Sequence, residues 1–284
     1  HKEYRRQRQM CIRDRSIAGI MYSGDKEFKV PSIRWDGTIK YWIMDKILRA
    51  FWNRYFHYDW AFGLFLILLF GVPRFVIVLQ SYVTRSYGIV MFVFLAMWFV
   101  PFIFLTGYGR KCIGIRKPDH CGRLFLSFIA GGMSCAVIFA LFFLLYDKTI
   151  DNAFVYIGGN NPGAFISGPD KQLYFWIAVI PSMIFSPIGE EFLYRGMIHG
   201  SFVQRFGESK ASVLDSLAFA VTHVAHFGIV YVSGIWQFLP FPAILWVLSM
   251  FVVSQIFFRC KQFCNSIWGA VFAHAGFNCF MMYF

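Results

Sequence analysis

The sequence predicts an all-α membrane protein: a polytopic helical bundle with about seven transmembrane helices, preceded by an amphipathic interfacial helix. Of the 284 residues, 58% are hydrophobic and only 15% are charged, whereas a soluble domain carries about 25% charged residues. Several stretches of about 20 residues, the length a helix needs to cross a bilayer, carry almost no charge. These observations exclude a disordered chain, a collagen-like repeat and a small disulfide scaffold, and they disfavour a soluble enzyme.

Residues 1–16 form a basic tip, which begins at His1 and resembles translated adaptor sequence. We expect this tip to be non-native or disordered and leave it out of the fold prediction. The alternative is a basic arm that binds anionic lipid or nucleic acid. The tip has no interleaved aromatic residues and no nucleic-acid-binding fold behind it, so we expect membrane lipids and no nucleic acid as partners.

Residues 17–58 are predicted to be a cytoplasmic or interfacial segment. Apolar side chains recur there at helical spacing beside lysines and arginines, which is typical of an amphipathic helix lying in the membrane interface. The apolar positions are Trp42, Ile43, Ile47, Leu48, Phe51 and Trp52.

Residues 59–284 form the predicted transmembrane domain. Seven apolar segments lie at approximately 60–80, 89–107, 124–145, 173–198, 212–230, 241–258 and 266–284. Each is long enough to cross a hydrocarbon core of about 30 Å at about 1.5 Å per helical residue. Because lipid offers the backbone no hydrogen bonds, we expect these segments to be helices. The residues between them, including 146–172, 199–211 and 231–240, are expected to be loops.

Two charged residues of these segments need an explanation. Arg74 follows Pro73 inside the first segment; it could pair with a carboxylate, but we expect an irregular break there and an arginine that snorkels to the interface. Asp215 lies near one end of the fifth segment. We expect it at a helix start, where a carboxylate suits the helix dipole.

The distribution of Lys and Arg predicts the orientation of the bundle, because cytoplasmic loops carry more of them. Segment 17–58 has seven, loop 108–123 has five, loop 81–88 has one and loop 231–240 has none. We therefore expect a cytoplasmic N-terminus, seven crossings and a C-terminus on the far side; an eighth crossing within 17–58 would overturn this. The cysteines that this topology places in the cytoplasm are expected to be unlinked thiols rather than zinc ligands.

Ionisable residues inside membrane helices are costly and indicate function. Glu190 and Glu191 project about 100° apart around one helix, so they face different neighbours. Glu191 and Arg195 have the spacing and order of a helix ion pair. That pair leaves Glu190 to face a cavity, where an apolar environment would make it an effective base.

Two other segments contribute imidazoles and an amide. His274 and Asn278 are four residues apart and share a helix face, whereas His223 and His226 are three apart. Glu190, His223, His274 and Asn278 around one cavity would resemble a hydrolytic site: a carboxylate takes a proton from water, one imidazole orients that water, and the other imidazole and the amide stabilise an oxyanion. No Ser or Cys lies in a recognisable nucleophile setting, so direct attack by water is the natural mechanism. We interpret His226 as a packing residue.

Three motifs on separate apolar segments carry a family resemblance. They are Glu190-Glu191-x-x-x-Arg195, Phe219-x-x-x-His223 and His274-x-x-x-Asn278. Together they resemble the CPBP (Abi) intramembrane metalloprotease or glutamate protease family, which includes type II CAAX prenyl endopeptidases and proteins linked to bacteriocin processing and self-immunity. Residues 110–118 also resemble the segment that often precedes the family core, so the resemblance covers about 110–284.

The resemblance implies a role for each motif residue. Glu190 would be the general base on water with His223 assisting, and His274 and Asn278 would stabilise the oxyanion. Glu191 and Arg195 would form a supporting ion pair. The implied enzyme is a metal-independent intramembrane endopeptidase without a cofactor. Its substrate would be a peptide or a lipidated protein, and its location a bacterial cell membrane rather than the endoplasmic reticulum.

Several alternatives stay open. A zinc ion held by Glu190, His223, His226 and His274 has suitable ligands, but no HExxH sequence is present. A non-catalytic immunity or scaffold protein of the same fold would keep its binding without the polar residues. A transporter or proton relay would also use buried Glu and His, but the sequence has no inverted repeats or paired broken helices. For the protease we expect a water-filled cavity that opens toward the cytoplasm.

Overall fold

The computed structural model describes residues 46–86, 88–160 and 170–284. The predicted basic tip 1–16 and the greater part of segment 17–58 lie outside these residues. In chain order the elements are η1 (Trp52–Arg54), α3 (Trp60–Leu66), η2 (Ile67–Gly71), α4 (Val72–Thr84), α5 (Gly88–Phe104), α6 (Gly107–Cys112), α7 (Cys121–Tyr146), α8 (Ala153–Gly159), α9 (Asp170–Glu191), η4 (Phe192–Ile198), α10 (His199–Thr222), η5 (His223–Ala225), β1 (Ile229–Val232), β2 (Ile235–Phe238), α11 (Pro240–Cys264) and α12 (Ile267–Tyr283). Among these, η2 and η4 are π-helices, and η1 and η5 are 3₁₀ helices.

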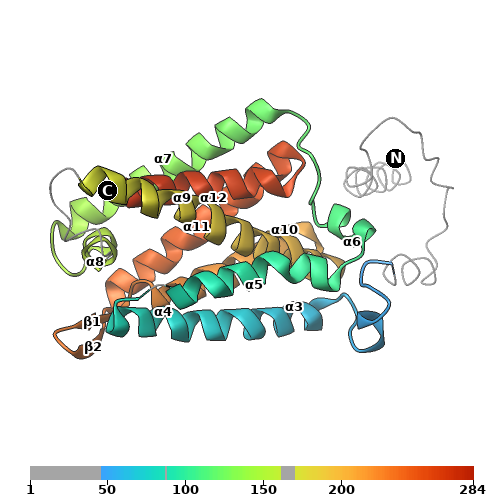
Figure 1. The fold of residues 1–284 in the computed structure, drawn as a ribbon, viewed down its shortest axis with the longest axis horizontal. Helices are drawn as coiled ribbons and strands as arrows, with labels where there is room; N and C mark the ends of the chain where they lie inside the picture. The colour runs from blue at the N-terminus through green and yellow to red at the C-terminus, as the bar shows by residue number, and fades with distance from the viewer. Residues whose placement is uncertain (1–45, 87, 161–169) are drawn as a thin grey trace, which may run out of the picture. The chain divides into compact units, whose positions relative to one another are not determined.

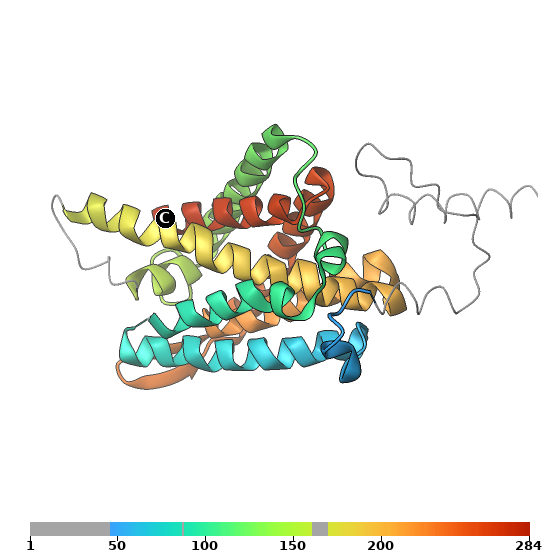
Figure 2. The ribbon, with the colours of Figure 1, turned by 45° about the vertical axis from the view of Figure 1, so that its right-hand side comes forward.

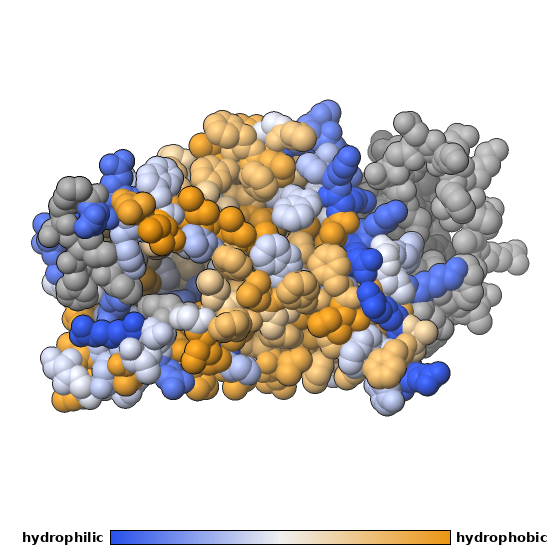
Figure 3. All heavy atoms as spheres, viewed as in Figure 1, coloured by the Kyte–Doolittle hydropathy of each residue, from blue (hydrophilic) through white to orange (hydrophobic). Residues whose placement is uncertain are grey.

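The long helices lie side by side, and apolar side chains cover the middle of the bundle. Figures 1 and 2 show α3–α4, α5 and α9 running in roughly the same direction. In Figure 3 apolar residues form a central band with hydrophilic residues toward both ends of the bundle. This distribution is expected of a protein whose middle faces lipid.

Four helical stretches in the described ranges are long and apolar enough to cross a membrane: Trp60–Thr84, Cys121–Tyr146, Asp170–Ala225 and Pro240–Cys264. A shorter apolar helix spans Gly88–Phe104. The all-α membrane bundle is therefore confirmed. The number of seven crossings stays a prediction.

Residues 46–58 do not form the expected amphipathic helix. They contain turns, the short helix η1 and an isolated antiparallel bridge between Leu48 and Leu105. Backbone hydrogen bonds join Arg49 N to the Phe104 carbonyl and Thr106 N to the Ile47 carbonyl, both at 2.9 Å. Ile47 and Leu48 are buried against the end of α5. Their apolar side chains are therefore removed from water without forming an amphipathic helix.

Two expected loops are also structured. Residues 199–211 belong to α10, which is kinked at Gly207; a φ of 75° there is readily available to glycine. The expected loop 231–240 instead contains the end of β1 and all of β2, which form an antiparallel hairpin. Ser233 and Gly234 both have positive φ, the geometry of a tight hairpin turn with a twist that matches the strands.

Asp215 is buried inside α10 and not at a helix start. Its Oδ2 lies 2.7 Å from Nδ1 of His199, and Nε2 of the same imidazole lies 2.8 Å from Oε2 of Glu208. His199 precedes the Gly207 kink, and both carboxylates follow it. Because α10 begins at His199, thirteen residues before the expected segment, Asp215 became an interior residue that needs a buried partner.

Glycines allow the closest helix contacts. A Cβ at Gly131 of α7 would come within 1.7 Å of the Ala273 carbonyl oxygen, and one at Gly276 of α12 would come within 2.0 Å of that of Phe128. The backbones of α7 and α12 are therefore in direct contact, as small residues permit in membrane bundles. In the same way, Gly189 of α9 packs against the Phe94 carbonyl of α5. These contacts fix the segments next to Glu190 and His274.

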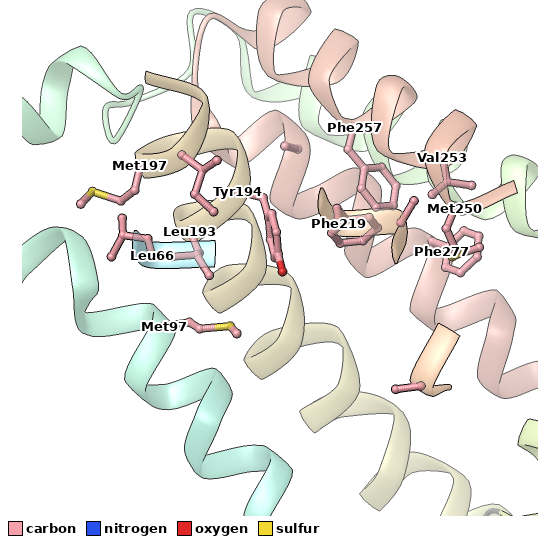
Figure 4. Close-up of a cluster of buried hydrophobic side chains, with 14 of the residues drawn as sticks. Leu66, Met97, Leu193, Tyr194, Met197, Phe219, Met250, Val253, Phe257 and Phe277 are labelled. Carbon is pink, nitrogen blue, oxygen red and sulfur yellow. The ribbon is translucent and has the colours of Figure 1, made fainter. Parts of the chain in front are cut away.

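The apolar core surrounds the centre of the bundle. Figure 4 shows Leu66, Met97, Leu193 and Met197 on one side of Tyr194, and Phe219, Val253 and Phe257 on the other. All seven flanking side chains are buried. Charged groups embedded in such packing need partners within the protein.

Candidate active site

The predicted site residues come from the ends and middles of separate elements. Glu190 and Glu191 end α9, His223 opens η5, and His274 and Asn278 lie on α12. Both glutamates and the two histidines are buried, whereas Asn278 is partly exposed. Segments up to 88 residues apart in the sequence therefore meet in the middle of the bundle.

Glu190 is not solitary, because Arg74 of α4 pairs with it. Arg74 Nη2 lies 2.7 Å from Glu190 Oε1, and the side chains are 2% and 0% exposed. The expectation that Arg74 snorkels to the interface is therefore wrong. The π-helix η2 gives an irregular turn just before Pro73, and α4 presents the guanidinium to the bundle interior, where it meets an ionisable partner.

The same guanidinium contacts the two histidines that follow α10. Nη2 lies 3.4 Å from Nε2 of His223 and 3.1 Å from Nε2 of His226. Nη1 donates to Oγ1 of Thr222 at 3.0 Å. His226, interpreted from sequence as a packing residue, is thus joined to the site.

The hydrogen bonds of His223 define its tautomer. Its Nδ1 lies 2.7 Å from the carbonyl oxygen of Phe219. A carbonyl only accepts, so Nδ1 carries the proton and Nε2 presents its lone pair to Arg74. In this arrangement the acceptor nitrogen of His223 is already engaged.

Glu191 forms the predicted ion pair and a second contact that the sequence did not indicate. Its Oε2 lies 3.1 Å from Nε of Arg195, and its Oε1 lies 2.8 Å from Nδ1 of His274. Nε2 of His274 is 4.0 Å from Oε2 of Glu190. His274 therefore lies between the two carboxylates, hydrogen-bonded to Glu191 and 4.0 Å from Glu190, and each carboxylate also pairs with an arginine.

Asn278 lies one helical turn beyond His274 on α12. Its Nδ2 donates to the carbonyl oxygen of Ser182 on α9 at 2.8 Å. The amide has a second N–H and an acceptor oxygen. The four predicted residues are thus brought together by α9, η5 and α12.

A cavity of about 420 Å³ adjoins this cluster. Its polar lining includes Arg74, His223, His226, His274 and Asn278, and its apolar lining is rich in Phe and Met. Glu190 lies behind this wall and reaches it through Arg74 and His274.

The lining of the cavity differs from the expectation of cytoplasmic access. It includes Ile157 of α8, Tyr174 near the start of α9 and Met282 near the end of α12. Among the lining residues none comes from loop 108–123, the loop that positive charge assigns to the cytoplasm. The cavity extends toward the end of the bundle that holds α8 and the hairpin.

No group of three or more His, Cys, Asp or Glu residues within the described part of the chain is arranged to hold a metal ion. Three of the four residues of the zinc alternative, Glu190, His223 and His226, face the guanidinium of Arg74 instead.

Comparison with known proteins gives a match to one protein family. Residues 172–280 match the family model described as type II CAAX prenyl endopeptidase Rce1-like. No curated protein and no solved structure matches the chain. The matched segment contains the motif residues on α9, η5 and α12, whereas α3, α4 and α5 lie outside it. The match therefore confirms, over residues 172–280, the resemblance to the CPBP and CAAX protease family that the three motifs predicted.

Proposed function

We propose that the protein is an intramembrane endopeptidase of the CAAX protease type, which hydrolyses a peptide bond by direct attack of water. The observation that carries this proposal is the position of His274: one imidazole on α12 contacts both carboxylates at the end of α9, beside a cavity that His223 and Asn278 also line. Two imidazoles and an amide that line one cavity, with a carboxylate base directly behind them, are the groups that water-dependent acyl transfer requires.

Glu190 is the proposed general base. One of its oxygens pairs with Arg74; the other, Oε2, has no hydrogen-bond partner among the described residues. A buried acceptor without a donor marks a place for water. Water bound to Oε2 would lie on the His274 side of the carboxylate and could lose its proton to Glu190 as it attacks the carbonyl carbon.

His274 and Asn278 are the proposed oxyanion contacts. They share one face of α12, and both line the cavity. Glu191 accepts a hydrogen bond from Nδ1 of His274 and thereby directs Nε2 toward Glu190 and the cavity. Nε2 can donate to the oxyanion when the ring carries a proton on both nitrogens. His223 is the proposed assistant to the base, held beside Glu190 because the same nitrogen of Arg74 contacts both side chains.

The substrate is proposed to be a peptide with an apolar chain. The cavity wall contains Phe94, Phe185, Phe277 and Met250 beside its polar groups, and such a wall accommodates an apolar chain while the polar groups orient the scissile bond. A lipidated peptide and an unmodified apolar peptide both fit this chemistry, so the assay should contain both.

Replacement of Glu190 by Gln tests the function. The substitution keeps the volume and removes the base, so we expect at least about a 100-fold loss of cleavage. The measurement uses purified protein in lipid vesicles, with a prenylated peptide and its unprenylated counterpart as substrates. Asp170→Asn, an exposed carboxylate at the start of the same helix, is the matched control and should cleave normally.

The outcomes separate the hypotheses. A folded Glu190→Gln protein that cleaves like wild type contradicts the protease. Substrate binding by the wild type without cleavage of either peptide favours a non-catalytic binding or immunity role.

A further inference from the structure

Arg74 is a buried cation that the three motifs do not include. It lies on α4, outside the segment 172–280 that matches the protease family. Its side chain is 2% exposed and also lines the cavity. A buried arginine at this depth requires a reason, because an unpaired charge in an apolar interior is strongly unfavourable.

A single nitrogen of Arg74 faces three acceptors from two different elements. Nη2 lies 2.7 Å from Oε1 of Glu190, 3.1 Å from Nε2 of His226 and 3.4 Å from Nε2 of His223. A guanidinium only donates, and its planar fork fixes the directions of its N–H bonds. The positions of the acceptors are therefore coupled through one rigid group.

The backbone around Arg74 directs its guanidinium into the site. The π-helix η2 ends at Gly71, and Pro73 follows in the first turn of α4. A Cβ at Gly71 would lie 3.4 Å from Cγ2 of Thr222, so α4 approaches the end of α10 closely. Thr222 anchors the other terminal nitrogen, Nη1, at 3.0 Å.

We propose that Arg74 is a positioning residue of the proteolytic site: its guanidinium holds Glu190, His223 and His226 in register at the cavity wall. The inference rests on the proposed protease function. Arg74 binds the Oε1 side of Glu190 and leaves Oε2 on the side of His274 for water. The cation thus orients the carboxylate, and Glu190 remains the group that takes the proton from water.

A purely structural ion pair would explain the burial but would not predict a specific effect on turnover. If Arg74 positions the base, its loss lowers kcat and leaves KM nearly unchanged, because the apolar binding wall is intact. Displacement of a catalytic group by about 1 Å costs on the order of 100-fold in rate. A structural role alone would lower the unfolding temperature and leave the kcat of the folded fraction unchanged.

The test compares kcat and KM of Arg74→Gln and Arg74→Lys in lipid vesicles. We expect about a 100-fold lower kcat for Arg74→Gln, with KM within about threefold. Arg74→Lys should be intermediate, at about tenfold, because an ammonium can pair with Glu190 but cannot reproduce the fork. Added methylguanidine should partly restore an Arg74→Ala protein and should not restore Glu190→Gln.

Thr222→Val gives a second test that leaves the buried charge in place. It removes the hydroxyl that accepts from Nη1, and we expect a severalfold lower kcat even if Arg74→Gln fails to fold. Arg205→Gln, an exposed arginine of α10, is the matched control and should behave like wild type.

Wild-type kcat in the folded Arg74→Lys and Thr222→Val proteins, or a rise in KM alone, would overturn the positioning role. Loss of cleavage in Glu190→Gln together with normal Arg74 variants contradicts only this inference. Normal cleavage by Glu190→Gln contradicts the protease itself.

Discussion

At the scale of single residues, the site is two ion pairs joined by an imidazole. Glu190 pairs with Arg74, Glu191 pairs with Arg195, and His274 contacts both carboxylates. In this arrangement two arginines balance the charge of two buried carboxylates. Each of the two guanidinium groups binds one carboxylate from one side and thereby fixes its orientation.

The position of Arg74 leads to a prediction about metals. Its guanidinium lies where Glu190, His223 and His226 converge, so a divalent cation bound by these three residues would have to displace it. We therefore expect cleavage to persist after exhaustive treatment with EDTA and 1,10-phenanthroline. A zinc protease treated in parallel serves as the control. Loss of cleavage that returns with added zinc would contradict the metal-independent site.

Sequence reasoning identified one ion pair and missed the other for a simple reason. Glu191 and Arg195 lie on one helix, where a spacing of four residues is sufficient to predict contact. Arg74 and Glu190 lie on different helices, and no spacing relates them. The available signal was the cost of an arginine inside an apolar segment, which favours a buried carboxylate partner over snorkelling when the residue lies far from the segment ends.

At the scale of elements, direct backbone contacts position the proposed catalytic side chains. Gly131 of α7 packs against Ala273, next to His274, and Gly276 of α12 packs against Phe128 of α7. The interface has no room for a methyl group, because the Cβ of any other residue would overlap a carbonyl oxygen. The stability of the bundle and the position of His274 therefore depend on the same glycines.

This packing predicts that two glycine substitutions on α7 have different effects on the stability of the protein. Gly131→Ala should destabilise the protein by about 1–3 kcal/mol, since overpacking forces the helices apart. Gly122→Ala, where a Cβ would meet no atom within 4 Å, should be neutral or stabilising by up to about 1 kcal/mol. Unfolding in detergent, followed by circular dichroism, measures both. Equal stability of the two variants would contradict the close α7–α12 contact.

Composition and length predicted the helices better than the connections. The apolar segments are helical over most of their length because lipid leaves the backbone no other arrangement. The connection 199–211 is polar, which favours a loop, yet it is helical on both sides of Gly207. His199 pairs with Glu208 and Asp215 across the kink, a tertiary arrangement that local polarity does not reveal.

At the scale of the whole molecule, the ends of the bundle differ. One end carries α6 and the basic loop 108–123; the other carries α8 and the β1–β2 hairpin (Figure 1). The cavity extends toward the hairpin end. If the excess of Lys and Arg assigns loop 108–123 to the cytoplasm, the substrate reaches the site from the opposite side of the membrane.

Cysteine labelling tests this orientation. We expect Ser233→Cys, in the exposed turn of the hairpin, to react with a membrane-impermeant maleimide in intact cells. Cys121, which is exposed at the start of α7, should react only after the membrane is permeabilised. Both measurements use a background in which Cys11 and Cys112 are replaced by Ser, and Cys121 is also replaced by Ser in the Ser233→Cys protein, so that one exposed cysteine is followed at a time. Labelling of Cys121 in intact cells, with protection of residue 233, would reverse the orientation and place the cavity mouth on the cytoplasmic side, because the fold ties the hairpin and the cavity to the same end of the bundle.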